Sequence, residues 1–240
     1  GKLFAWFQRY SDFIVCNSEN AKNMWLTHYP LFKEKLKVIY NIVDLQQIST
    51  KYIFRREGRI HIVIAASYQY IKNPTGLAEA LCLLTDEEKE KIAIDWYGSK
   101  NIAGYGDMAY REVKELIEKN SLQDILSLHE ASINILNIMD EADFVGLFSK
   151  YEGMPNSICE GMMLGKPIIM TRVSDYRRLV DETNGILCDY DNVESIVNAL
   201  SLSIRLDENR VKQMGRNSYI KAKTLFSKEN ILPYWFDLLN

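Results

Sequence analysis

RIHIVIAAS, residues 59–67, is the stretch that decides the fold. Its β-branched residues follow one another almost without a polar break, which is typical of a strand that is covered on both faces. A helical pattern comes next, with Pro74 at its start and an apolar stripe of period 3.6 through TGLAEALCLL. The stretch therefore predicts a buried parallel strand that leads into a crossover helix.

The same alternation of strand and helix continues along the chain. Further strands are expected at 91–98, 125–130, 143–149, 167–171 and 185–190, with helices between them. Three helices close the chain, over 192–204, 207–226 and 228–239, and two shorter strands at 13–18 and 37–41 precede the decisive stretch. Parallel strands need a connecting element, so this order predicts an α/β protein with a Rossmann-like, doubly wound parallel sheet. Ligands bind beyond the carboxyl ends of such strands.

The composition limits the classes of function. The 240 residues are 47% hydrophobic and 25% charged, as in soluble globular proteins, and the formal net charge of −3 gives no reason to expect a nucleic-acid partner. No apolar run approaches the roughly 20 residues of a membrane span, and no signal peptide is visible. Cys16, Cys82, Cys159 and Cys188 form no CxxC pair, so we expect reduced thiols and a cytoplasmic compartment. The start at Gly1 suggests a fragment of a longer chain.

Two patterns that suggest a cofactor or a metal do not meet the requirements of such sites. GYGDMA (104–109) has dinucleotide-like glycines, but five residues separate it from Gly98 at the strand end, so we interpret it as a loop. His28, His61 and His129 have no neighbours at metal-ligand spacing. His129 differs from the other two because it falls at the carboxyl end of a strand. The sequence therefore requires no metal and no cofactor.

YEGMPNSICEGMMLGKPII (151–169) carries the chemistry. Pro155 suits the first turn of a helix, where the N–H groups of residues 156–158 would be unpaired and would favour a diphosphate. Gly153 allows close approach of a ligand. Glu160, inside the helix, can accept hydrogen bonds from ribose hydroxyls, and Glu152, in the preceding turn, can face a sugar. The alternative is that both glutamates are solvated acids at a helix start.

Three segments resemble those of a known enzyme family. FSKYEGMPNSICEGMMLGKPIIMTRVSDYRRLVDETNGIL (148–187) is similar to the carboxyl-terminal signature of family-four, retaining GT-B glycosyltransferases, also called glycosyl transferases group 1. KVIYNIVD (37–44) resembles the interdomain segment of that family, and IVIAASYQYIKNPTGLAEAL (62–81) resembles its phosphate-binding segment. The resemblance implies that the predicted sheet is one half of a GT-B fold.

The resemblance also implies roles for individual residues. Glu152 and Lys72 would be catalytic: Glu152 would hold the donor sugar, and Lys72 would bind the leaving diphosphate. Glu160 would bind the ribose, and the remaining donor contacts would be Gly153, Met154, Pro155, Asn156 and Ser157 for sugar and diphosphate, and His129, Glu130 and Ala131 for the base. Ser67 stands where the family has a phosphate-binding arginine. Arg172 is a candidate substitute, although a surface role explains it as well.

The resemblance divides the chain into three segments. Residues 1–55 would be a remnant of the acceptor-side domain and the linker, 56–226 the domain that binds the nucleotide-sugar donor, and 227–240 a terminal crossover helix. Tyr234, Trp235 and Phe236 on that helix would face the rest of the amino-terminal domain. The alternative is that the helix packs on its own domain.

The implied reaction moves a sugar from a nucleotide-diphosphate sugar to an acceptor hydroxyl with retention, in polysaccharide or glycoconjugate synthesis. The acceptor would be a glycan or lipid-linked glycan held by the amino-terminal domain. The location would be cytoplasmic, at the inner face of the membrane if the enzyme associates with it peripherally. Two alternatives stay open: a sugar-nucleotide epimerase of the same architecture, and a non-catalytic nucleotide-sugar-binding or interaction module, which Ser67 favours.

Overall fold

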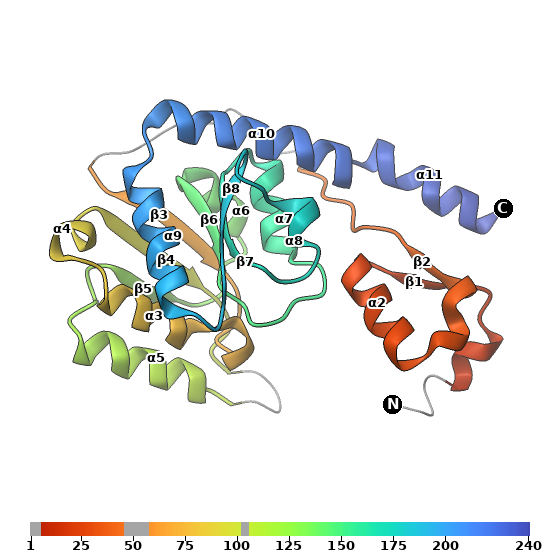
Figure 1. Ribbon diagram of the computed structural model, residues 1–240, viewed down its shortest axis with the longest axis horizontal. Coiled ribbons are helices and arrows are strands. Elements are labelled where there is room, and N and C mark those ends of the chain that lie inside the picture. Colours follow the sequence, from red (N-terminus) through yellow and green to blue (C-terminus); the bar gives the residue numbers. More distant parts are fainter. Residues whose placement is uncertain (1–5, 46–57, 102–105) are drawn as a thin grey trace.

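The computed structural model of the protein describes residues 6–45, 58–101 and 106–240. These residues form a large α/β part and a small amino-terminal part, which lie side by side (Figure 1). The small part contains β1 (Ile14–Cys16), α2 (Glu19–His28) and β2 (Leu36–Val38), besides the short helices η1 (Gln8–Tyr10) and η2 (Pro30–Lys35). Its two strands pair in parallel. The strand predicted over 37–41 is therefore shorter than expected, because residues 39–41 already leave for the large part.

Six parallel strands form the sheet of the large part, in the order β5-β4-β3-β6-β7-β8. They are β3 (Ile60–Ala65), β4 (Ile92–Tyr97), β5 (Leu126–His129), β6 (Phe144–Leu147), β7 (Ile168–Thr171) and β8 (Gly185–Cys188). The chain moves outward from β3 to β5, returns to place β6 beside β3, and then moves outward in the other direction. The predicted doubly wound parallel sheet is confirmed, and its topological switch point lies between β3 and β6.

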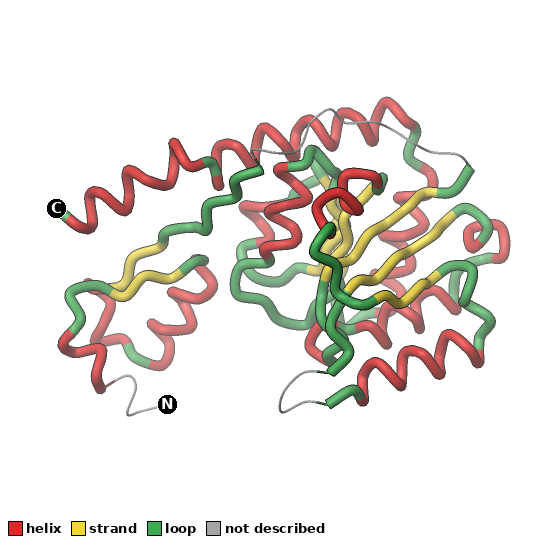
Figure 2. Tube along the Cα trace, turned by 180° about the vertical axis from the view of Figure 1, so that it is seen from behind, coloured by secondary structure: helices red, strands yellow, loops and turns green. Residues whose placement is uncertain are grey.

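Helices cover both faces of this sheet (Figures 1 and 2). On one face, α3 (Pro74–Cys82), α5 (Met108–Lys119) and α9 (Val193–Arg205) share a core with the isoleucines of β3. On the other face, α6 (Ile135–Glu141) and α7 (Asn156–Met163) pack against Val63 and Val145. The long helix α10 (Glu208–Phe226) contributes to both cores. Burial on both faces explains the nearly continuous apolar run at 59–67.

Four short helices were not predicted: η2 (Pro30–Lys35), η3 (Tyr70–Lys72), α4 (Asp86–Lys89) and α8 (Tyr176–Leu179). Each spans at most six residues, too few to show a hydrophobic period. A capping box between Thr85 and Glu88 specifies α4 locally.

The last helix, α11 (Lys228–Leu239), extends beyond the sheet toward the small part (Figure 2). The Val43 N–H donates to the carbonyl of Phe226 at 3.0 Å, and the ring of Tyr40 packs edge-on against Phe226 with centroids 5.9 Å apart. The carboxyl-terminal helices thus bind the segment that joins the two parts. None of the helices in the described parts of the chain has both the length and the apolar character that a bilayer crossing needs.

Candidate functional site

Lys72 and Glu152 form an ion pair at the switch point, although 80 positions separate them in the sequence. Lys72 ends η3 in the loop after β3, and Glu152 lies in the loop after β6. The Lys72 Nζ atom lies 2.6 Å from Glu152 Oε1, and the two side chains are only 22% and 11% exposed. Water and salt screen such a partly buried pair less than a surface pair. The sheet therefore brings the two predicted catalytic residues into direct contact.

The carboxylate of Glu152 is held by more than the lysine. Ser149 Oγ donates to Glu152 Oε1 at 2.6 Å, and the Ser149 carbonyl in turn accepts from Thr171 Oγ1 at 2.6 Å. The Lys150 N–H donates to the Ile71 carbonyl at 2.7 Å, which ties the loops after β3 and β6 together. These bonds connect the ends of three adjacent strands, so the acid has a defined position before any ligand arrives.

Helix α7 begins at Asn156, one residue later than predicted. Pro155 is the residue that precedes the helix rather than its first residue, and its carbonyl accepts the N–H groups of Ile158 at 3.0 Å and Cys159 at 3.1 Å. The expectation of three unpaired amides is therefore wrong for Ile158. The amides of Asn156 and Ser157 lie at the first two helical positions, where a helix supplies no acceptor. These two N–H groups remain as candidate hydrogen-bond donors to an anion.

Close packing fixes the position of α7 over β6. A Cβ atom added to Gly161 would lie 2.8 Å from the side chain of Val145 on β6, closer than side chains pack. Glycine therefore allows the helix to approach the strand, and the amino end of the helix is held near Glu152. Met154 and Pro155, at the entrance to the helix, are buried. The Asn156 side chain accepts a hydrogen bond from Asn41 Nδ2 at 2.8 Å.

Glu160 has a different environment from Glu152. It is half-buried on α7, and burial raises the pKa of its carboxyl group. Within the described parts of the chain, no hydrogen bond or ion pair to this carboxyl is found. A partly desolvated carboxylate gains most from hydroxyl groups that donate to it. The interpretation of both glutamates as solvated acids therefore fails for Glu152, which is nearly buried and paired, and describes Glu160 poorly.

His129, the predicted base contact at the end of β5, is held by its neighbours. Its Nε2 atom lies 2.6 Å from Asp95 Oδ1, and its ring stacks on Tyr97 with centroids 4.4 Å apart. Asp95 also contacts His61 Nε2 at 2.7 Å, and the hydrogen bond from His61, followed by that from His129, holds the pKa of Asp95 below its usual value. Sequence analysis missed Asp95, whose signal is an acid inside an otherwise apolar strand.

The remaining predicted contacts surround this strand end. Glu130 forms an ion pair with Lys100 at 2.8 Å, and Ala131 is exposed. Ser67 is half-buried, and the next residue, Tyr68, is buried with its hydroxyl donating toward the carbonyls of Trp96 at 2.6 Å and His129 at 2.8 Å. The loop after β3 is thereby anchored to the ends of β4 and β5.

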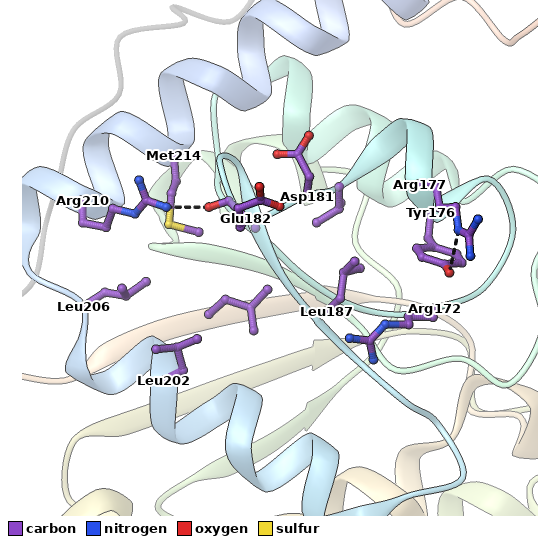
Figure 3. A pocket seen from close by; sticks show the side chains of 13 residues that line it. Arg172, Tyr176, Arg177, Asp181, Glu182, Leu187, Leu202, Leu206, Arg210 and Met214 are labelled. Carbon is purple, nitrogen blue, oxygen red and sulfur yellow. Dashed lines mark hydrogen bonds between the residues drawn. The ribbon is translucent and has the colours of Figure 1, made fainter.

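Arg172, the candidate substitute for the phosphate-binding arginine, is already paired with an acid. It forms an ion pair with Asp189 at 2.9 Å and lines a cavity of about 610 Å³ along β8 (Figure 3). Arg177 and Arg210 also line this cavity, which contains none of the residues predicted to bind the donor. A surface role therefore describes Arg172 better than a phosphate contact.

Other expectations concern cysteines, metals and cofactors. All four cysteines are free; Cys16, Cys159 and Cys188 are buried, and burial raises the pKa of each of these thiols. Among the described residues, no three His, Cys, Asp or Glu side chains are placed to hold a metal ion. The GYGDMA segment lies partly outside the described residues.

Comparison with known proteins places this architecture among glycosyltransferases. The chain is 27% identical over 209 residues to an uncharacterized glycosyltransferase of Methanocaldococcus jannaschii, covering 86% of this chain and 53% of that protein. A crystal structure of a glycosyltransferase from Rickettsia africae matches 99% of this chain and 66% of its own, with a TM-score of 0.85 and 18% identity. Anabaena HepE, solved in complex with UDP and glucose, matches 97% of this chain and 64% of its own, with a TM-score of 0.84 and 18% identity.

The structural matches establish the fold: the α/β architecture with its six-stranded parallel sheet is that of GT-B glycosyltransferase structures. The chain spans 40% to 53% of the length of the curated relatives that it matches. The family described as glycosyl transferases group 1 matches residues 59–205, which include the switch point, α7 and most of the sheet's covering helices. The chain therefore belongs to the glycosyl transferases group 1 family.

Proposed function

We propose that this chain is the donor-binding half of a retaining glycosyltransferase, which moves a sugar from a nucleotide-diphosphate sugar to an acceptor hydroxyl. The observation that carries the proposal is the meeting of Lys72, Glu152 and the two open amides of α7 at the switch point. The complex of Anabaena HepE with UDP and glucose supports a nucleotide sugar as the ligand class. Binding and leaving-group chemistry both follow from the charges at this point.

The diphosphate is assigned to the amino end of α7. The amides of Asn156 and Ser157 and the positive end of the helix dipole favour an anion there. Lys72 adds a cation that can shift from Glu152 toward the phosphate as negative charge develops on the leaving group. Ser67 supplies no charge where an arginine is expected, and Lys150, exposed beside Ile71, is the candidate for a second cation.

The two glutamates are assigned to different parts of the donor. Glu160 accepts hydrogen bonds from the ribose hydroxyls, which compensates its desolvation. Glu152 faces the sugar, where its negative charge stabilises the positive charge of an oxocarbenium-like transition state. The base lies against the loop at His129, Glu130 and Ala131. Lys72 and α7 supply the positive charge that the reaction needs, so the proposal includes no metal and no cofactor.

The acceptor is assigned to sequence outside the donor domain. Residues 1–55 belong to the acceptor side, 56–226 to the donor domain, and 227–240 to the helix that connects them. The acceptor is a glycan or lipid-linked glycan in polysaccharide or glycoconjugate synthesis. The reaction takes place in the cytoplasm, with peripheral association at the inner face of the membrane.

Titration calorimetry with UDP, GDP and ADP sugars tests the proposal. At least one donor should bind, and Glu160→Ala should weaken binding at least tenfold, because it removes both charge-assisted hydrogen bonds to the ribose. Glu115→Ala, an exposed glutamate of α5, is the matched control and should leave binding unchanged. If none of the three donor classes binds, or if both variants bind as the wild type does, the assignment is wrong.

The replacement of the phosphate-binding arginine by Ser67 favours a second candidate, a nucleotide-sugar-binding module without catalysis. This candidate predicts that a donor binds, that Glu160→Ala weakens it, and that the full-length protein transfers no sugar to glycan or lipid-linked acceptors. Donor hydrolysis in the absence of acceptor separates the two candidates. A transferase should release nucleoside diphosphate slowly, and Glu152→Gln should abolish this release.

A further inference from the structure

Asp175 bonds the large part of the protein to the small one. Its carboxylate lies just before α8 and points at the amino end of α2. Oδ2 accepts the N–H of Glu19 at 2.8 Å, and Oδ1 accepts the N–H of Asn20 at 2.8 Å. The hydroxyl of Tyr40 also donates to Oδ2, at 2.8 Å. One acid thus receives two hydrogen bonds from the small part and one from the segment that joins the two parts, and its exposure is only 8%.

These bonds complete the capping of α2. The first amides of a helix lack acceptors within the helix. Ser18 supplies the local cap, because its side chain accepts the Ala21 N–H at 3.0 Å. The two amides before Ala21 are those that Asp175 accepts. Two of these three amides are therefore capped by a residue more than 150 positions away, so α2 is fully capped only when the two parts are together.

Helix α2 in turn contacts the loop that carries Glu152. Asn20 Nδ2 donates to the carbonyl of Glu152 at 3.2 Å. One turn further along the same face, Met24 Sδ accepts from the Tyr151 hydroxyl at 3.2 Å. On the other side of this loop, the Ser174 hydroxyl donates to the carbonyl of Gly153, from a left-handed backbone position with φ 56°. Residues 151–153 are held between α2 and the Ser174–Asp175 turn.

We infer that Asp175 is a positioning residue, which locks α2 against the loop of residues 151–153 and so holds Glu152 in place for transfer. The contacts of Asp175 are independent of the proposed function; only the sugar transfer that they would serve rests on it. A carboxylate suits this role because all three of its partners donate hydrogen bonds, and because negative charge is favoured at a helix amino end. An asparagine at position 175 would turn its side-chain NH₂ group toward one of these three donors, and that hydrogen bond would be lost. The carboxylate also occupies the α2 amino end, so α7 is left for the diphosphate.

Hydrogen exchange in the full-length protein tests the lock directly. Asp175→Ala should raise the exchange of amides 19 and 20 at least tenfold, measured in fragments that begin before residue 17. Asp175→Asn should have an intermediate effect, and Tyr40→Phe a small one, because it leaves both amides capped. Asp207→Ala is the matched control, since Asp207 caps α10 by accepting the Arg210 N–H at 2.8 Å within the large part. It should leave exchange at α2 unchanged.

Kinetics then separate positioning from stability. Asp175→Ala should lower kcat by roughly 10- to 100-fold, as a displacement of about 1 Å at a reacting group does. The KM for the donor should change less than threefold, because the proposed donor contacts come from the large part. Asp175→Asn should recover part of kcat. Asp207→Ala loses a comparable cap and should lower Tm with kcat unchanged.

The two levels of proposal fail in different ways. Unchanged exchange at α2 in Asp175→Ala would overturn the lock, whether or not the protein transfers sugar. Raised exchange with unchanged kcat would reduce Asp175 to a structural contact and also overturn the inference. Failure of the proposed function instead shows as the absence of donor binding in the wild type, while the exchange of α2 still reports the lock.

Discussion

The charge of Lys72 is balanced inside the protein by Glu152, unlike that of a surface lysine without a paired acid. Its partner Glu152 is 11% exposed and also accepts from Ser149. Removal of one member of such a pair leaves the other desolvated without a counter-charge. The lysine is therefore important for the folded state as well as for the proposed chemistry, and the two effects can be separated.

Lys72→Met should destabilise the chain by roughly 1–3 kcal/mol, the cost of a buried polar group without its partner. Adding Glu152→Gln should recover part of this loss, because the uncompensated charge is then gone. Urea unfolding of the wild type, both single variants and the double variant measures the coupling. The kcat of Lys72→Met should fall by roughly 10²- to 10³-fold and should not recover in the double variant. Additive losses of stability would contradict a direct interaction.

Glu160 should show the opposite balance between stability and binding. Burial raises the pKa of the Glu160 carboxyl in the folded state. The carboxyl group therefore stabilises the folded state at pH values below its unfolded pKa, and this contribution is lost as the pH rises through the folded pKa. Glu160→Gln should therefore raise Tm at pH 7 by about 1–2 °C while it weakens donor binding. The gain should shrink as the pH falls below the raised pKa. Thermal scans from pH 4 to 8 check this, and a gain independent of pH would contradict it.

At the scale of elements, the apolar pattern of the sequence predicts the strands and longer helices well, but it predicts long-range contacts poorly. The apolar runs at 59–67 and 143–149 specify central strands because burial on both faces leaves no polar positions. Helix α7 begins one residue later than predicted. Pro155 was expected at the first helical position, but it precedes the helix, and its carbonyl accepts the N–H groups of Ile158 and Cys159.

The missed contacts have a common physical origin. Asp95 joins His61 and His129 only because β3, β4 and β5 are adjacent, and Asp175 caps α2 only because the two parts meet. Neither contact has a local pattern. Lys72 and Glu152 were assigned from a resemblance to known enzymes, whereas their pairing across β3 and β6 follows from the strand order.

The packing of α7 on β6 gives a prediction for an element. Gly161→Ala places a methyl group where Val145 already lies, so the helix has to move away from the strand. We expect a loss of about 1–3 kcal/mol, typical of overpacked cores, together with weaker donor binding as the helix end shifts. Val145→Ala should cost less in the Gly161→Ala background than in the wild type. Urea unfolding measures this cycle, and equal costs in both backgrounds would mean that the two side chains do not meet.

At the scale of the whole molecule, α11 presents apolar side chains that the described residues do not cover. Ile231 is buried against the large part, whereas Tyr234, Phe236 and Leu239 are 60%, 59% and 77% exposed. The neighbouring small part also exposes Trp6 and Tyr10. Exposed apolar side chains in a row along one helix mark a surface for another protein segment, in agreement with the proposed acceptor-side domain.

Substitutions on the two faces of α11 should therefore differ. Ile231→Ala should destabilise this chain by about 2–4 kcal/mol through loss of core packing. The double variant Tyr234→Ser/Phe236→Ser should change the stability of this chain by less than about 0.5 kcal/mol, but should lower the Tm and activity of the full-length protein. Thermal unfolding of both lengths checks this, and equal effects of the double variant on both lengths would contradict a covered face.

The strand order has a consequence for biosynthesis. A nascent chain that has emerged only as far as β5 can pair β3 with β4 and β5, but β3 still lacks β6, its neighbour on the other side. Lys72, at the carboxyl end of this half-sheet, has no Glu152 to pair with until the ribosome has translated 80 more residues. Such long-range pairing is slow to form. The Lys72–Glu152 pair of the proposed donor site therefore forms late in biosynthesis, once β6 has been translated and has paired with β3.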